Sequence, residues 1–288
     1  MDFRRFRVLP RKKVNLRRYS PADTRPFEHK EQAAARLDRG LERLVALQEH
    51  LYAHNRWAML LIFQGMDAAG KDSAIKHVMS GLNPQGTQVF SFKRPSDEEL
   101  DHDYLWRTVK ALPERGRIGI FNRSYFEEVL VVRVHPEILG GEKLPASLVT
   151  GRIWNDRYED INAFERHLAR NGTIIRKFFL HVSKKEQRRR LLERLDEPSK
   201  NWKFQSGDLA ERDRWNDYMK AYEEALSNTS TKHAPWFIIP ADHKWFMRLA
   251  IAEVVVDALD GLDLALPKLS KADLEELAAA RKRLESEP

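Results

Sequence analysis

Short apolar runs alternate along the chain with longer stretches in which hydrophobic residues recur every three or four positions. The first pattern predicts buried β-strands, and the second predicts amphipathic helices that cover them. Strands are expected at residues 57–63, 87–92, 118–121, 173–182 and 235–239, and helices at 30–52, 73–79, 97–112, 154–168, 184–195, 208–226 and 244–259. Because strands and helices alternate, the pattern predicts an α/β fold. We expect a parallel five-stranded sheet with helices on both faces and functional residues at the carboxyl ends of the strands.

The first predicted strand is followed by a segment whose spacing is typical of a phosphate-binding loop. Gly65 and Gly70 enclose four residues, and Lys71 follows at the expected start of a helix. Glycines let backbone amides turn toward a ligand, the helix start adds the positive end of its dipole, and lysine adds a mobile cation. All three features favour a chain of phosphates, so the loop predicts phosphoryl transfer.

The loop departs from the usual pattern at the position after the lysine. A serine or threonine normally stands there and holds magnesium, whereas this chain has Asp72, with Ser73 one place later and Asp67 inside the loop. A carboxylate within the loop would repel phosphate unless a divalent cation lay between them. We therefore expect Asp67 to bind a metal ion. The alternative is a turn aspartate that accepts a hydrogen bond from its own backbone.

The third predicted strand ends in a second group of polar residues. Many phosphate-loop enzymes have an acidic residue here that helps to hold magnesium, but this chain has Asn122, which moves the metal role to Asp67. Arg123 would emerge at the tip of the strand, where a guanidinium can bind phosphate oxygens in a forked geometry. An arginine at a strand end can also be a plain surface charge. Glu127 and Glu128 follow, and the sequence does not say which of the two faces the site.

The helix expected at 184–195 is dense in cations. Arg188 precedes Leu191 and Leu195 by three and seven residues, so it is expected on the inward, apolar face. Arg190 and Arg194 lie on a different side and are expected to be solvated. An inward cation is costly unless it meets an anion, which makes Arg188 the candidate to contact the transferring phosphoryl group. The alternative is an arginine that lies over a leucine patch with its charge in water.

The connection after this helix, residues 196–207, mixes proline, glycine, cations and two aromatic residues. Together with the helix it predicts a mobile lid over residues 184–207 that closes over phosphates and excludes water. Lys203 is its candidate substrate-binding cation.

Positive charge is concentrated at the N-terminus. Residues 1–18 contain eight Arg or Lys and one acid, Asp2, a balance that equals the net charge of +7 of all 288 residues. Two interpretations stand side by side for this basic arm, which we place at residues 1–19. It is either a solvated or partly disordered tail or a device that captures a polyanion, either nucleic acid or a long phosphate chain.

The remaining composition predicts a soluble, cytoplasmic enzyme. Charged residues make up 32% of the chain and hydrophobic residues 42%, and there is no cysteine, which excludes disulfides and thiolate chemistry. The apolar runs are too short to cross a bilayer, and no signal segment follows the basic N-terminus. After a phosphotransferase domain at residues 20–262, residues 263–288 predict a charged helix with a capping-box-like start at Ser270. We expect it to be a surface helix or an oligomer contact.

Several spaced motifs together resemble the polyphosphate kinase 2 family. The stretches that carry the likeness are 65–72, 121–124, 188–203 and the pairs Pro235-Trp236 and Lys244-Trp245. The likeness extends from about residue 20 to about residue 260. It implies a three-layer phosphate-loop kinase fold similar to thymidylate kinase, with a helical lid. It also implies Mg²⁺-dependent phosphoryl transfer between inorganic polyphosphate and a nucleotide, in a protein that forms homo-oligomers.

The resemblance also implies roles for particular residues. Asp67 would bind the metal, Lys71 the phosphates, Arg123 would match the strand-three arginine and Arg188 the lid arginine, and these four form the expected catalytic set. The residues expected to bind phosphate or substrate are Gly65, Ala68, Ala69, Gly70, Asp72, Glu127 and Lys203.

The acceptor is expected to be a nucleoside diphosphate. Glu127 resembles family members that accept monophosphates, whereas the loop more closely resembles members that use diphosphates. We therefore expect ADP and GDP, with AMP as a further candidate. One rival is an ATP-dependent nucleotide kinase. Another is a non-catalytic, polyanion-binding phosphate-loop protein, although nucleic acid is not the expected partner and no membrane association is expected.

Overall fold

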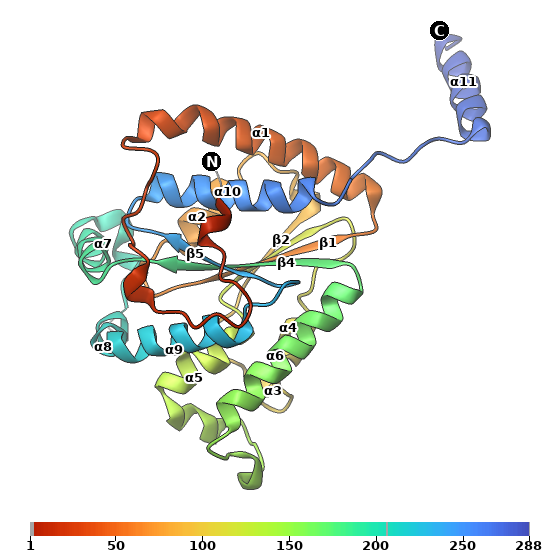
Figure 1. The fold of residues 1–288 in the computed structure, drawn as a ribbon. Helices are drawn as coiled ribbons and strands as arrows, with labels where there is room; N and C mark the ends of the chain where they lie inside the picture. Colours follow the sequence, from red (N-terminus) through yellow and green to blue (C-terminus); the bar gives the residue numbers. More distant parts are fainter. Residues whose placement is uncertain (1–2, 206, 288) are drawn as a thin grey trace.

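A central parallel sheet organises the molecule, and the structure, a computed structural model, describes residues 3–205 and 207–287. The sheet has five strands in the order β2-β3-β1-β4-β5 with helices on both of its faces (Figure 1), as the sequence predicts. The strands are β1 (Ala58–Gln64), β2 (Thr87–Ser91), β3 (Ile118–Asn122), β4 (Thr173–His181) and β5 (Trp236–Pro240). The predicted α/β architecture is confirmed.

Helices connect the strands and cover the sheet. The α-helices are α1 (Lys30–His54), α2 (Lys71–Val78), α3 (Asp97–Leu100), α4 (Trp106–Val109), α5 (Val131–Val134), α6 (Ile153–Arg170), α7 (Lys184–Asp196), α8 (Gly207–Asp213), α9 (Trp215–Thr229), α10 (Lys244–Asp260) and α11 (Lys271–Glu285). Short 3₁₀ helices include η1 (Phe3–Phe6), η2 (Leu16–Arg18), η4 (Tyr125–Val129) and η7 (Pro198–Lys203). In Figure 1, α1 and α10 lie on one face of the sheet, and α6 and α9 lie on the other.

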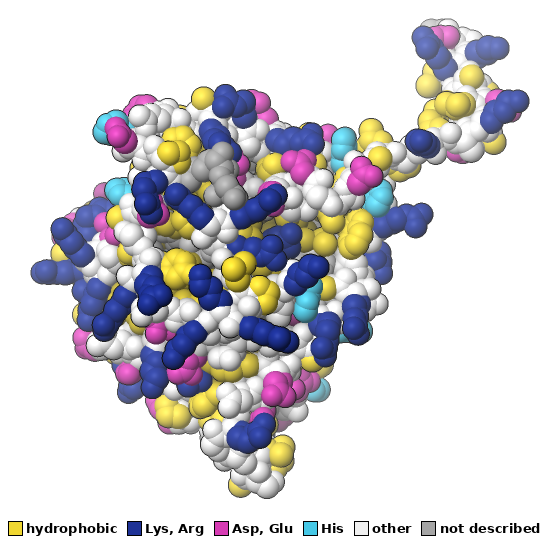
Figure 2. Space-filling model, viewed as in Figure 1, with side chains coloured by type: hydrophobic (Ala, Val, Ile, Leu, Met, Phe, Trp, Pro, Cys, Tyr) yellow, Lys and Arg dark blue, Asp and Glu magenta, His cyan; other side chains and the backbone are white. Residues whose placement is uncertain are grey.

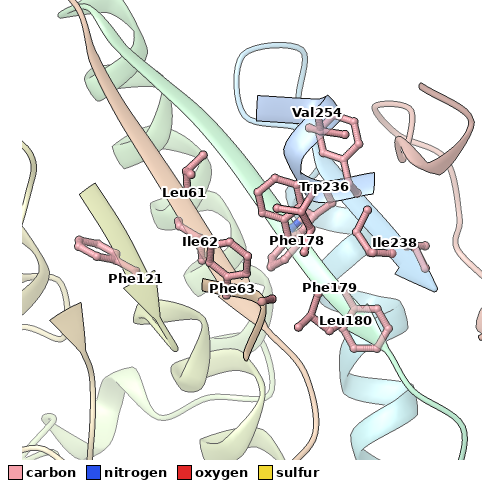
Figure 3. Packing of buried hydrophobic residues seen from close by; sticks show 14 of the residues in the cluster. Leu61, Ile62, Phe63, Phe121, Phe178, Phe179, Leu180, Trp236, Ile238 and Val254 are labelled. Carbon is pink, nitrogen blue, oxygen red and sulfur yellow. The ribbon is translucent and has the colours of Figure 1, made fainter. Parts of the chain in front are cut away.

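Strand β1 occupies the middle of the sheet, and all seven of its residues are buried. Its neighbours are β3, which pairs Phe63 with Asn122, and β4, which pairs Gln64 with Phe179. Large apolar side chains from these strands fill the core, and the rings of Phe63 and Phe178 stack with centroids 5.1 Å apart (Figure 3). The register brings the carboxyl ends of β1, β3 and β4 together at one edge of the sheet.

A fully buried ion pair lies within this core. Lys177 of β4 donates hydrogen bonds to Glu165 of α6 (Nζ–Oε2, 2.5 Å) and to the carbonyl of Thr229 (2.7 Å). The hydroxyl of Tyr125 donates to the other oxygen of Glu165 at 2.8 Å. The network therefore ties β4 and α6 to η4, the turn that begins two residues after Arg123.

The basic N-terminal segment is packed against the body of the protein. Phe3, Phe6 and Val8 are buried, and the amide of Val8 donates to the carbonyl of Trp236 at 2.8 Å, beside an antiparallel bridge between Arg7 and Phe237. Its basic side chains at positions 11–13, 17 and 18 are exposed. The interpretation as a solvated tail is wrong for residues 3–19, because apolar residues between the cations anchor the segment along β5.

Two predicted helices are divided. The helix expected at 97–112 becomes α3 and α4, because a capping box of Ser96 and Glu99 starts a short helix and Asp103 caps a new turn by accepting from the amide of Leu105. The helix expected at 208–226 becomes α8 and α9.

The C-terminal helix α11 forms as predicted, has no buried residue, and stands away from the body in Figure 1. Among the described residues, no helix is long and apolar enough to cross a membrane.

Candidate active site

The loop between β1 and α2 has a backbone that turns tightly at three positions. Ala68 and Gly70 have φ angles of 59° and 106°, in the region that favours glycine. At Gly65, a Cβ atom would lie 3.0 Å from the carbonyl oxygen of Leu180 in β4. A side chain at Gly65 would therefore force the loop away from the sheet, and one at Gly70 would strain the start of α2.

Lys71 is buried beneath this loop. Its ammonium group donates to the carbonyls of Gly65 (2.7 Å) and Met66 (3.2 Å). Burial, together with the neighbouring charge of Arg123, lowers the pKa of Lys71 to about 8. A cation held by neutral carbonyls in a dry position is costly, so the site gains stability when an anion arrives.

Arg123 brings together two carboxylates of the predicted site. Its backbone has a φ of 64°, and its amide donates to the carbonyl of Phe63, which fixes the turn at the end of β3. The guanidinium donates to Asp67 (Nη2–Oδ1, 2.7 Å) and to Glu127 (Nη1–Oε2, 2.9 Å). The pKa of Arg123 is raised, chiefly by Glu127. The structure thus places Asp67, Lys71, Arg123 and Glu127 in one cluster at the carboxyl edge of the sheet.

Asn122 and Asp72 form a second link across this edge. The amide of Asn122 donates to Asp72 (Nδ2–Oδ1) at 2.7 Å, which joins the tip of β3 to the first turn of α2. The carboxylate that replaces the usual hydroxyl residue therefore has a positioning contact in this structure.

The predicted orientation of α7 is wrong. Arg188 is exposed, and so is Leu195, at 48%. The residues that face the core are Gln187, Arg190 and Leu191, so the buried stripe is shifted by one position from the one we predicted. The helix contains few apolar residues, and polar contacts with the loop rather than a leucine stripe determine which face turns inward.

Arg190, which we expected to be solvated, is 5% exposed and binds backbone carbonyls of the phosphate loop. Its Nη1 donates to the carbonyls of Ala68 (3.1 Å) and Ala69 (2.8 Å), and its Nη2 donates to the carbonyl of Ala241 (2.5 Å). Glu186 neutralises it at 2.7 Å, with a pKa lowered to about 2, first by Arg189 and also by Arg190.

Gln187 adds a further contact to the loop, from Nε2 to the carbonyl of Asp67 at 3.0 Å. Neither Gln187 nor Arg190 was among the predicted site residues. The spacing of Gln187, Arg190, Leu191 and Arg194 is that of a helical face, which was the available signal.

The lid segment beyond α7 is open to solvent. Trp202 is 77% exposed, and the ammonium of Lys203 lies 5.0 Å from the centroid of its ring. Within the described part of the chain, neither Lys203 nor Arg188 makes a hydrogen bond or ion pair with loop residues 65–72. Asp208 pairs with Arg194 at 3.2 Å. Its pKa is raised chiefly by burial and also by the negative charge of Asp67.

The oxygen donors near the loop suit a hard divalent cation. In the described residues, no group of three or more His, Cys, Asp or Glu side chains is arranged to hold a metal ion. Mg²⁺ commonly uses one or two carboxylates and completes its shell with water and substrate phosphates. Asp67, 24% exposed at the loop with Glu127 nearby, fits that mode of binding.

Comparisons with known proteins agree on one family. The family model described as Polyphosphate kinase 2 (PPK2) matches residues 28–266. The chain is 53% identical over 283 residues to an ADP-polyphosphate phosphotransferase of Rhodopseudomonas palustris, covering 98% of each protein. It is 46% identical over 269 residues to an AMP/ADP-polyphosphate phosphotransferase of Meiothermus ruber, covering 92% of this chain and 96% of that one.

A solved structure supports the same assignment. The crystal structure of Polyphosphate Kinase 2 from Arthrobacter aurescens matches with a TM-score of 0.88 and 41% identity, covering 96% of this chain and 95% of that one. The phosphate loop, the parallel sheet and these likenesses lead to one conclusion: this chain belongs to the polyphosphate kinase 2 family.

Proposed function

We propose that this protein transfers phosphoryl groups reversibly between inorganic polyphosphate and a nucleoside diphosphate, ADP or GDP, with AMP as a further acceptor. The observation that carries the proposal is the buried ammonium of Lys71, held by two carbonyls beside Arg123 and beneath a loop of inward-turning backbone. Relatives named for ADP- and AMP/ADP-polyphosphate phosphotransfer support the choice of substrates.

The reaction needs alignment and charge neutralisation more than a covalent nucleophile, because the acceptor is already an anionic phosphate oxygen. In this proposal the loop amides and Lys71 bind the phosphates. Arg123, oriented by Glu127 and Asp67, neutralises charge on the group in transfer. Gln187 and Arg190 hold the loop carbonyls, so that the loop keeps its shape while phosphates enter and leave.

The lid residues complete the site in this proposal. Arg188 projects from α7 into solvent directly beside Gln187, which contacts the loop. We expect Arg188 to contact phosphates that extend from the loop and Lys203 to follow when residues 196–207 close. Exposure of both cations before substrate binds agrees with that role, because neither has to be desolvated until phosphate arrives.

We also propose that the reaction depends on Mg²⁺. Asp67 would hold the ion, and Glu127 and Asp208 are the neighbouring carboxylates. When bound, Mg²⁺ would neutralise charge on the phosphate oxygens. Because Asp67 also pairs with Arg123, its carboxylate can be shared between the guanidinium and the ion without being buried alone.

The test is ATP formation from ADP, long-chain polyphosphate and Mg²⁺, with AMP and GDP run in parallel. Product that requires polyphosphate and disappears on chelation of Mg²⁺ supports the proposal, and the relative rates identify the preferred acceptor. Turnover with ATP as donor and none with polyphosphate would support an ATP-dependent nucleotide kinase instead. Binding of polyphosphate without turnover would support the non-catalytic alternative. Sedimentation of the same protein tests the expected homo-oligomer.

A further inference from the structure

A cavity lies at the carboxyl ends of β4 and β5, between the sheet and the N-terminal segment. It measures about 280 Å³, and none of its lining residues belongs to loop residues 65–72. Its floor is the end of β4 and β5, at His181 and Pro240, and its walls come from the N-terminal segment. Figure 2 shows Lys and Arg side chains gathered over this face of the molecule.

The walls carry an excess of positive charge. Arg5, Arg18 and Arg25 line the cavity together with one acid, Asp23. Asp23 pairs with Arg25 at 2.9 Å and with Arg5 at 3.6 Å, and hydrogen bonding to Arg25 lowers the pKa of Asp23. Within the described ranges 3–205 and 207–287, Arg18 makes no ion pair. Two units of positive charge therefore face one small space.

Hydrogen bonds hold the backbone of the segment that carries Arg18. The amide of Leu16 donates to Glu223 of α9 at 2.7 Å, and Asn15 caps η2 by accepting from the amide of Arg17. Beyond the turn, the carbonyl of Pro21 accepts from the amide of Asp242 at 3.0 Å. Residues on both sides of Arg18 are thus tied to the body, and the cavity is a built feature rather than a gap beneath a loose tail.

The floor contains a buried imidazole, His181, whose pKa is lowered by burial and raised in part by the backbone of Tyr19 and Leu16. His181 is 7% exposed, and its Nδ1 is buried with no hydrogen-bond partner among the residues that the structure describes. Buried polar atoms are nearly always satisfied by protein or by bound molecules. Phe6, Tyr19 and Ile238 also line the cavity and offer apolar surface next to the cations.

We propose that this cavity is a second anion site, which binds the phosphate groups of a small phosphorylated ligand on Arg5, Arg18 and Arg25. Guanidiniums are the side chains best suited to phosphate oxygens, and a site with a few convergent polar groups and an apolar wall is the usual form of a small-molecule site. A nucleotide and the end of a phosphate chain share this chemistry. The apolar wall favours a ligand with an organic part.

The segments that line the cavity are connected to the phosphate loop by backbone contacts. The carbonyl of Leu180, which precedes His181, is the atom that Gly65 approaches. Arg190 donates to the carbonyls of Ala241 and Asp242, directly after the cavity residue Pro240. A ligand in the cavity would therefore contact the segments that hold both the loop and α7.

The experiment is isothermal titration calorimetry on the full chain, with ADP and tripolyphosphate as separate probes. The wild-type protein is compared with Arg18→Ala and with Arg17→Ala, a matched control that removes one exposed charge from the neighbouring position outside the cavity. We expect a binding event that Arg18→Ala weakens about tenfold or more, the effect of losing a charged hydrogen bond. Arg17→Ala should leave that event unchanged.

The two probes distinguish the sources of phosphate. Loss in Arg18→Ala for ADP alone assigns the cavity to nucleotides, and loss for both probes assigns it to phosphate groups as such. Equal weakening by Arg17→Ala would attribute the binding to the general positive field and overturn the proposal. Isotherms of Arg18→Ala identical to wild type for both probes would overturn it as well.

Discussion

Lys71 and Lys177 are both buried, yet their ammonium groups have different partners. Lys177 in β4 meets the carboxylate of Glu165, which in turn accepts from Tyr125. Lys71 at the start of α2 meets two backbone carbonyls. Burial lowers the pKa of both lysines, but Glu165 opposes that effect at Lys177 by direct pairing. A paired buried cation organises the core, whereas a buried cation without a bonded carboxylate leaves room for an anionic ligand.

Removing Lys177 should give the largest effect, and on stability. Lys177→Met leaves Glu165 buried without its partner, and breaking such a pair costs about 3–5 kcal/mol. Urea denaturation followed by circular dichroism measures the loss of free energy of unfolding. The double variant Lys177→Met/Glu165→Leu should recover most of it, because it removes both charges. A loss below about 1 kcal/mol in the single variant would contradict the assignment of this pair to the core.

Removing Lys71 should instead affect turnover. Lys71→Met removes a cation from the phosphate loop, and losing one such contact lowers the rate about 10²- to 10³-fold. The free energy of unfolding should stay the same or rise, because an incompletely compensated buried charge has gone. Initial rates of ATP formation and urea denaturation measure the two quantities.

The control for this variant is Lys76→Met, which removes an exposed lysine from the same helix. It should retain wild-type turnover. If Lys71→Met lost stability as Lys177→Met does, or kept near-native turnover, the contrast between the two lysines would fail.

The arginines of α7 extend the contrast. Exposed Arg188 is proposed to act on substrate, so Arg188→Ala should lower turnover about 10²-fold without changing the free energy of unfolding. Buried Arg190 holds loop carbonyls, so Arg190→Ala should destabilise the protein by about 1.5–3 kcal/mol. Exposed Arg189, which pairs with Glu186 and Glu193, serves as the control and should change neither quantity substantially. Turnover near the wild-type rate in Arg188→Ala would remove Arg188 from the proposed catalytic set.

The sequence predicts a residue's position well when local spacing or strand order determines it. The loop from Gly65 to Lys71 follows from local spacing, and the meeting of Asp67 with Arg123 follows from the parallel sheet, which places strand ends at one edge. The sheet and most helices were predicted correctly because their hydrophobic periodicity is also a local pattern. The roles of Lys71, Arg123 and Arg188 in turnover stay predictions.

The orientation of α7 could not be derived in this way. Leu191 alone is compatible with a stripe through Arg188 or one through Gln187, and the choice depends on carbonyls of Ala68 and Ala69, about 120 residues earlier in the chain. The packing of the N-terminal segment likewise depends on its pairing with β5. The many cations of this segment suggested a solvated tail. The burial of Phe3, Phe6 and Val8 was missed because their partners in β5 and α10 lie more than two hundred residues away.

The smallest predicted effect is a fall in kcat/KM of about tenfold per pH unit above the pKa of Lys71. In the free protein this pKa is lowered to about 8 by burial, and only the protonated ammonium attracts phosphate. We therefore expect kcat/KM, as far as Lys71 controls it, to be constant well below pH 8 and to fall as the pH rises through 8. Initial rates at subsaturating polyphosphate between pH 6.5 and 9.5 measure the profile.

Lys71→Arg is the variant that decides whether this limb of the profile belongs to Lys71. A guanidinium does not titrate in this range, so the residual activity of Lys71→Arg should lose the fall near pH 8. If the fall persisted there, another group would be its source, and the ammonium of Lys71 would stay charged over the measured pH range. Lys71 and Lys177 would then differ in their hydrogen-bond partners and not in whether the ammonium loses its proton near pH 8. Phosphate binding would not be coupled to protonation of Lys71.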